Sequence, residues 1–140
     1  MRKRISMTLV SFVLILSMLC FSVSAVESEQ IVEPRYTGIS TFTTGLTLYD
    51  SGSARCTSSS TLSDPSYTQT LTMRLQRSVN QSVWTTLQSW SDSGDFTITL
   101  SGTRSITHGY YYRLYCTANV YTSSGSWYGS NTKISDSQYY

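Results

Sequence analysis

The only histidine of the chain and one of its cysteines lie on the same stretch, "HGYYYRLYCTANVYT", which covers residues 108–122. A cysteine can act as a nucleophile when a neighbouring imidazole accepts its proton. His108 and Cys116 are eight residues apart on an alternating pattern that predicts a strand, so roughly 26 Å separates them. This distance is far beyond hydrogen-bond reach, and we expect no catalytic pair here.

Carboxylates offer little more chemistry. "SDSGD" brings Asp92 and Asp95 close together, as in a calcium loop or a glycosidase pair, but calcium needs six or more oxygens. We interpret this segment as a β-turn, in which Asp and Gly are favoured for conformational reasons. The chain also lacks a glycine-rich phosphate loop, metal-ligand spacing of Cys and His, and an activated-serine motif. The sequence therefore predicts no enzyme, no metal centre and no cofactor.

Aromatic residues give the stronger signal, because residues 110–121 carry large side chains on both parities of the alternation. One parity holds the small and branched residues and is the predicted core face. The other parity and two tryptophans that share a parity in residues 83–90 form a candidate binding face: Tyr111, Arg113, Tyr115, Tyr121, Trp84 and Trp90. Interfaces favour these residue types. Two alternatives stay open: aromatic pairs that only stabilise a solvent-facing sheet, or tryptophans that belong to the core.

These residues must be positioned by strands, because no apolar helical spacing persists beyond two turns. Alternating runs between Gly, Ser, Asp and Asn predict strands over 38–49, 53–62, 69–77, 83–90, 96–102, 110–121 and 126–134. Phe96 is expected to share a buried face with Ile98 and Leu100. About seven short strands at this spacing predict an all-β, immunoglobulin-like, two-sheet antiparallel sandwich.

Cys56 and Cys116 fall on the second and sixth predicted strands, which face each other across the core of immunoglobulin-like folds. The third cysteine, Cys20, lies in a predicted signal peptide that is described below, so two cysteines remain after cleavage. Exported chains with an even number of cysteines usually pair them, and we therefore predict a disulfide. Closing this loop would restrict the unfolded chain by roughly 4 kcal/mol. The alternative is two separate buried thiols.

Two resemblances accompany this pattern. Tyr112, Leu114, Cys116 and Ala118 resemble the run that enters the sixth strand of fibronectin type III modules, which implies that Tyr112 is a corner residue bonding back to the chain. The chain is also similar to a group of small exported proteins of Gram-positive bacteria. The shared segments are "PRY" (34–36), "LQ…W…W" (Leu75, Gln76, Trp84, Trp90) and "G…YR" (Gly109, Tyr112, Arg113). This resemblance supports the fold and supplies no activity.

The first residues predict export. A basic start at residues 2–4, an uncharged run and small residues at Val23 and Ala25 indicate a signal peptide over residues 1–25, cleaved after Ala25. An uncleaved anchor is the alternative, and both export the rest of the chain. Three of the ten Lys and Arg residues lie in this segment and all eight Asp and Glu residues follow it, which leaves seven bases, eight acids and a net charge of −1. This balance gives no reason to expect binding to nucleic acid or, after cleavage, to a membrane.

We therefore expect an exposed lead-in over residues 26–36 and one sandwich domain over residues 37–140. The predicted function is a secreted, non-catalytic binding module that recognises a glycan or a protein at the cell surface. The alternative is a structural or assembly subunit that packs through tyrosine-rich faces and edge strands, and a secreted hydrolase ranks third, behind both. The pattern leaves the oligomeric state open.

Overall fold

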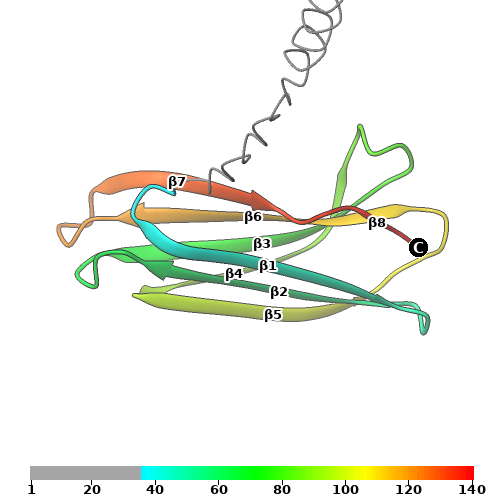
Figure 1. Ribbon diagram of the computed structural model, residues 1–140, viewed down its shortest axis with the longest axis horizontal. Coiled ribbons are helices and arrows are strands. Elements are labelled where there is room, and N and C mark those ends of the chain that lie inside the picture. The colour runs from blue at the N-terminus through cyan, green and yellow to red at the C-terminus, as the bar shows by residue number, and fades with distance from the viewer. Residues whose placement is uncertain (1–35) are drawn as a thin grey trace, which may run out of the picture. The chain divides into compact units, whose positions relative to one another are not determined.

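Eight strands make up the part of the chain that the computed structural model describes, residues 36–140 (Figure 1). The strands are β1 (Ile39–Tyr49), β2 (Ser53–Leu62), β3 (Thr68–Ser78), β4 (Thr85–Asp95), β5 (Thr97–Ser105), β6 (Tyr111–Tyr121), β7 (Trp127–Ile134) and β8 (Gln138–Tyr139). The predicted signal peptide and residues 26–35 of the predicted lead-in lie outside the described residues. Residues 36–140 contain no helix that is long and apolar enough to span a membrane.

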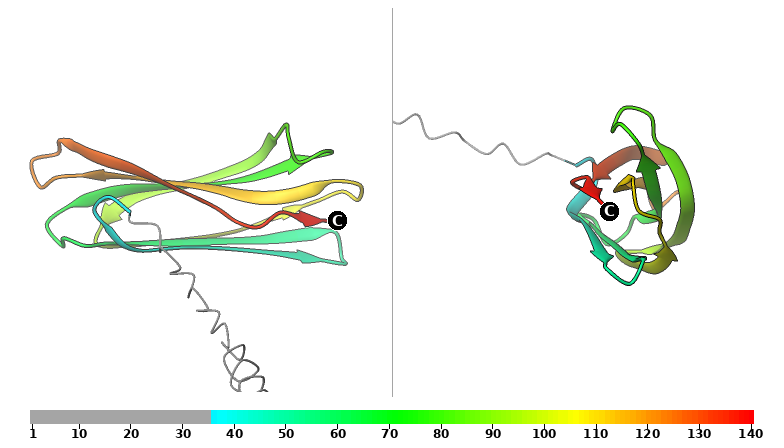
Figure 2. Two further views of the ribbon diagram at one scale, coloured as in Figure 1. Left: turned by 45° about the horizontal axis from the view of Figure 1, so that its top comes forward. Right: turned by 90° about the vertical axis from the view of Figure 1, so that its right-hand side faces the viewer.

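The strands form two antiparallel sheets that pack as two layers (Figure 2). The smaller sheet has the order β1-β2-β5 and the larger has the order β4-β3-β6-β7, with β8 added beside β6. The predicted all-β sandwich is confirmed. β4 pairs with β3, whereas the fourth strand of an antibody constant domain joins the first sheet, so the strand order differs from that of an antibody constant domain.

Strict alternation builds the core between the sheets. In β6 every second residue from Tyr112 to Val120 is fully buried, and the residues between are half-buried. β2 and β3 alternate in the same way. The buried hydrophobic residues are Ile39, Phe42, Leu46, Ala54, Cys56, Leu62, Leu71, Met73, Leu75, Ile98, Leu100, Tyr112, Leu114, Cys116, Ala118 and Val120.

Two predictions about the β4–β5 connection were wrong. The "SDSGD" segment is not a turn, since Ser91–Asp95 continues β4 and pairs with β3. The chain reverses instead at Phe96, whose φ of 23° lies outside the strand region. Phe96 is therefore 47% exposed, while Ile98 and Leu100 enter the core as predicted. A reversal this tight turns the Phe96 side chain away from the face that its spacing suggested.

Candidate functional site

The outer face of the larger sheet carries five of the six residues of the predicted binding face. Four of them alternate along β6 with the buried residues, so their side chains all leave the sheet on the side away from the core. The fifth, Trp84, precedes β4 and lies against one of these four. We call this surface the aromatic face, and these five members are Tyr111, Arg113, Tyr115, Tyr121 and Trp84.

Arg113 is the centre of a set of side-chain contacts on this face. Its guanidinium lies over the Trp84 ring at 4.0 Å from the centroid, a cation–π contact. Its Nε donates to Gln76 Oε1 at 3.0 Å, and Gln76 in turn donates to Thr86 Oγ1 at 3.3 Å. Partial burial lowers the pKa of Arg113, although an arginine keeps its charge at neutral pH. The face thus holds a positive charge in one orientation across three strands.

The β3–β4 loop positions Trp84 through local hydrogen bonds. Asn80 Oδ1 accepts the backbone N–H groups of Ser82 at 3.0 Å and Val83 at 3.2 Å, which is the side-chain bonding that asparagine supplies in turns. Trp84 Nε1 then donates to the carbonyl of Gln81 at 3.0 Å. The indole N–H is satisfied within the loop, so the ring presents its face to Arg113.

Trp90 does not belong to this face, although it shares its sequence parity with Trp84. A β-bulge changes the parity between them, because Leu75 pairs with Gln88 but the next residue of β3 pairs with Thr86, which leaves Leu87 as the extra residue. Trp90 is therefore opposite the fully buried Met73 and packs against the core. The prediction that Trp90 lies near the outer tyrosines was wrong.

Gly102 of β5 shows how closely the Trp90 indole fills the open side between β4 and β5. A Cβ built on Gly102 would overlap the indole ring. Only a glycine leaves room for a tryptophan at this point, which explains the "LSG" sequence in the middle of β5.

The sequence patterns missed three members of the aromatic face, because strand register brings them there. Trp127 is opposite Tyr121 and is 66% exposed. Tyr139 is opposite Tyr111, with 5.0 Å between the ring centroids, and is 65% exposed. The third member, Arg74 of β3, is opposite Tyr115. Of these three residues, only Arg74 could have been found from the sequence, because alternation over residues 69–77 places it on the outer parity.

Hydroxyl and amide side chains separate the two aromatic ends of the face. Two consecutive rows cross all four strands: Ser91, Thr72, Thr117 and Thr132, then Ser93, Thr70, Asn119 and Ser130. Side-chain hydrogen bonds link β3 to β4 in both rows, at 3.0 Å between Thr72 and Ser91 and 2.8 Å between Thr70 and Ser93. This belt is uncharged and offers many hydrogen-bonding groups.

Cys56 and Cys116 are free thiols in the structure, so the predicted disulfide is corrected. Both are fully buried on facing strands of the two sheets. Facing positions on two sheets do not by themselves make a bond, since a disulfide also needs Cα atoms within about 7 Å and Cβ atoms directed toward each other. Burial is the main cause that raises the pKa of Cys56, to about 12, and it also raises the pKa of Cys116, against a smaller lowering effect of the neighbouring Ser58 hydroxyl.

Tyr112 and His108 have structural contacts. The Tyr112 hydroxyl donates to the carbonyl of Thr107 at 2.7 Å and accepts its N–H at 3.0 Å, which is the bond back to the chain that the resemblance implied. His108 stacks on Tyr140 with ring centroids 3.9 Å apart. Neither residue contacts the aromatic face through these bonds.

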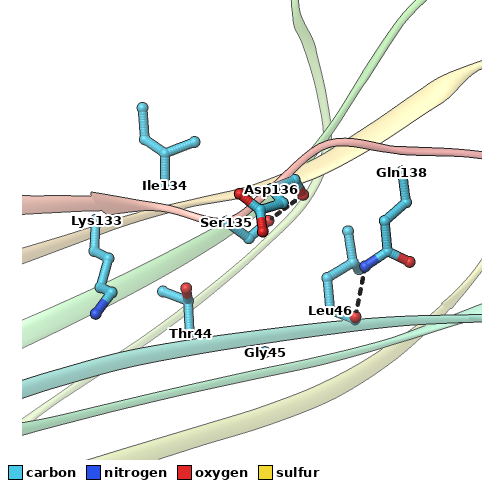
Figure 3. A pocket seen from close by; sticks show the side chains of 8 residues that line it. All are labelled: Thr44, Gly45, Leu46, Lys133, Ile134, Ser135, Asp136 and Gln138. Carbon is cyan, nitrogen blue, oxygen red and sulfur yellow. Dashed lines mark hydrogen bonds between the residues drawn. The ribbon is translucent and has the colours of Figure 1, made fainter.

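A second candidate lies at the edge between β1 and the β7–β8 segment, where a polar hollow of about 410 Å³ opens (Figure 3). Lys133 Nζ donates to the carbonyl of Phe42 at 2.6 Å, and Gln138 Nε2 donates to the carbonyl of Leu46 at 2.9 Å. These carbonyls belong to the edge strand β1. The two long side chains of the hollow therefore cover a sheet edge, which is a structural role.

No protein family model matches the chain, and no curated protein is significantly similar to it. Among residues 36–140, no group of three or more His, Cys, Asp or Glu side chains could hold a metal ion. Asp92 accepts the N–H of Ser93 at 2.8 Å, a local bond at the edge of the sheet.

Proposed function

We propose that the protein is an exported, non-catalytic binding module that recognises its ligand through the aromatic face. The carrying observation is the stack of Arg113 on Trp84, oriented by Gln76 and flanked by half-buried tyrosines. Tryptophan, tyrosine and arginine contribute most of the binding energy at protein surfaces that recognise ligands.

The experiment is a pull-down with isolated cell-wall material and a titration with soluble wall fragments, followed by tryptophan fluorescence. We expect binding by the wild type and a loss of at least about tenfold in affinity for Trp84→Ala and for Tyr115→Ala, the effect of an interface hot spot. Thr99→Ala is the matched control, because Thr99 is exposed on the smaller sheet. Equal binding by all four proteins would overturn the proposal.

The structure gives less support to the alternative, an assembly subunit that packs through edge strands. Lys133 and Gln138 occupy backbone carbonyls on the free edge of β1 that another strand would need. A concentration-dependent increase in mass on a sizing column, abolished by substitutions on the aromatic face, would favour the assembly function instead.

A further inference from the structure

We infer that the ligand of the aromatic face is an acidic polysaccharide, one whose repeating unit carries a carboxylate or a phosphate. This inference rests on the proposed function and adds the chemical class of the ligand. It is carried by two arginines, Arg74 and Arg113, on neighbouring strands of the face.

Arg74 and Arg113 occupy diagonal positions, since Arg74 pairs with Tyr115 and Gln76 pairs with Arg113. Diagonal neighbours on an antiparallel pair are about 7–8 Å apart. The contacts of the Arg113 guanidinium are with neutral groups, an amide oxygen and an indole ring. Both side chains leave the same side of the sheet, so an anionic group lying between them would be attracted to two positive charges. Arginine is also the side chain whose planar fork fits carboxylates and phosphates.

Asp136 lies between Ile134, which pairs with Tyr115, and Gln138, which pairs with Tyr112, so it is at the level of Arg113 along β6. Asp92 pairs with the buried Leu71, three residues from Arg74 along β3. Asp95 pairs with Thr68, which pairs with Tyr121, so it belongs to the opposite end. Asp136 lines the hollow between β1 and the β7–β8 segment (Figure 3). Among residues 36–140, no hydrogen bond joins Arg74 or Arg113 to a carboxylate, so both charges stay available to an anionic ligand although residues 26–140 carry a net charge of −1.

The rest of the face favours a saccharide over a protein partner. Protein interfaces have a well-packed apolar centre, whereas the middle of this face is the belt of hydroxyl and amide side chains. Ile134, which pairs with Tyr115, is the aliphatic residue that the register adds to the face. Hydroxyl and amide groups suit the many hydroxyls of a sugar chain, and tyrosine rings supply flat apolar surfaces for sugar rings.

The length of the face points to a polymer. Tyr111 and Tyr121 are the first and last residues of β6, which places them roughly 33 Å apart along the strand. A single sugar would cover one end of this face only. A chain of several residues would contact both aromatic ends, with the arginines selecting its charged groups.

The test measures binding of the protein to polygalacturonate, to a polyglycerol phosphate and to neutral dextran, at about 50 mM and about 500 mM salt. We expect one or both acidic polymers to bind, with affinity that falls at high salt, and dextran to bind weakly. Arg74→Gln and Arg113→Gln should each weaken acidic-polymer binding about tenfold or more, the loss expected of one charge-assisted hydrogen bond. Arg55→Gln is the matched control, because Arg55 is exposed on the other sheet.

The two acidic polymers distinguish a carboxylate from a phosphate source. Equal binding of dextran and the acidic polymers, or equal losses in Arg55→Gln and Arg74→Gln, would overturn the inference. If dextran binds and Tyr115→Ala abolishes that binding, the proposed function stands and only the acidic ligand class fails. Binding of cell-wall protein that polygalacturonate does not compete with would also overturn the inference. Thermal denaturation of each variant confirms that it is folded.

Discussion

The two outer faces of the sandwich use the same backbone alternation and expose different chemistry. On the smaller sheet, outward positions are mostly short hydroxyl side chains: Thr41, Thr43, Thr47, Ser53, Thr57, Ser59, Thr61, Thr97, Thr99, Ser101, Thr103 and Ser105. On the larger sheet, the aromatic face adds large rings at both ends of its hydroxyl belt and arginines at one end. Both faces cover one shared buried layer.

The two faces differ in which side-chain groups remain free to contact a ligand. Hydroxyls of the smaller sheet bond to one another across strands, at 3.0 Å between Ser59 and Thr99 and 3.1 Å between Thr61 and Thr97. Such pairs stabilise a sheet and need no ligand. The aromatic face instead exposes Trp127 and Tyr139, each about two-thirds accessible. A surface of this composition fits recognition better than stability, and the following predictions test that distinction.

The largest effect on stability is expected at Trp90, which packs against the buried layer between the two sheets. Trp90→Ala should lower the free energy of unfolding by about 3 kcal/mol, because it empties the space above Gly102. Trp84→Ala should cost about 1 kcal/mol or less, the value of an exposed cation–π contact. Urea denaturation of both variants and the wild type measures these two losses in the free energy of unfolding. If both variants lost a similarly small amount of unfolding free energy, Trp90 would be a surface residue like Trp84, and the assignment of the two tryptophans to different faces would be wrong.

A pH dependence is expected from the cysteines of the shared layer. Burial raises the pKa of Cys56 from 9.0 to about 12, so the folded protein holds this proton more tightly than the unfolded chain. The stability that the protonated thiol contributes is complete below pH 9 and is lost as the pH rises from 9 to about 12. The free energy of unfolding of the wild type should therefore fall more steeply over this range than that of Cys56→Ala.

The same cysteines also give a chemical readout. Because the thiolate is the reactive form, both thiols should resist alkylation in the native protein and react once it is unfolded. Recovery of no free thiol from the denatured, unreduced protein would contradict the structure and restore the disulfide.

The smallest effect is expected on the outer face of the smaller sheet. Thr99→Val removes the hydroxyl that bonds to Ser59 and keeps the branched shape of the side chain. The free energy of unfolding should change by about 0.5 kcal/mol or less, as for most surface substitutions. Binding to cell-wall material should be unchanged. A clear loss of binding would move the recognition surface to the smaller sheet.

The sequence predicted the shared layer well where strands are regular. Alternation over residues 69–77 and 110–121 gives the buried parity correctly, because Leu71, Met73 and Leu75 of β3 and Tyr112, Leu114, Cys116 and Ala118 of β6 are all buried. Prediction failed in and beside β4, where a bulge at Leu87 and the reversal at Phe96 interrupt the period of two. A bulge adds one residue on one strand, so its effect is visible only against the partner strand.

The sequence predicted only those members of the candidate site whose position follows from alternation within one strand. Tyr111, Arg113, Tyr115 and Tyr121 lie on one strand, and their common face follows from alternation alone. Arg74, Trp127 and Tyr139 join them through pairing with β6, which depends on strand order and register. Whether Cys56 and Cys116 are bonded likewise depends on the positions of their Cα and Cβ atoms in space, which spacing along the chain does not encode.

The sequence by itself determined that this chain forms strands with one buried and one solvent-facing side, because the period of the side chains is a local property of extended backbone. The tertiary structure alone decided which aromatic residues share a surface. It sends Trp84 outward to Arg113 and Trp90 inward to Gly102, since a single extra residue in β4 reverses the face of all that follows.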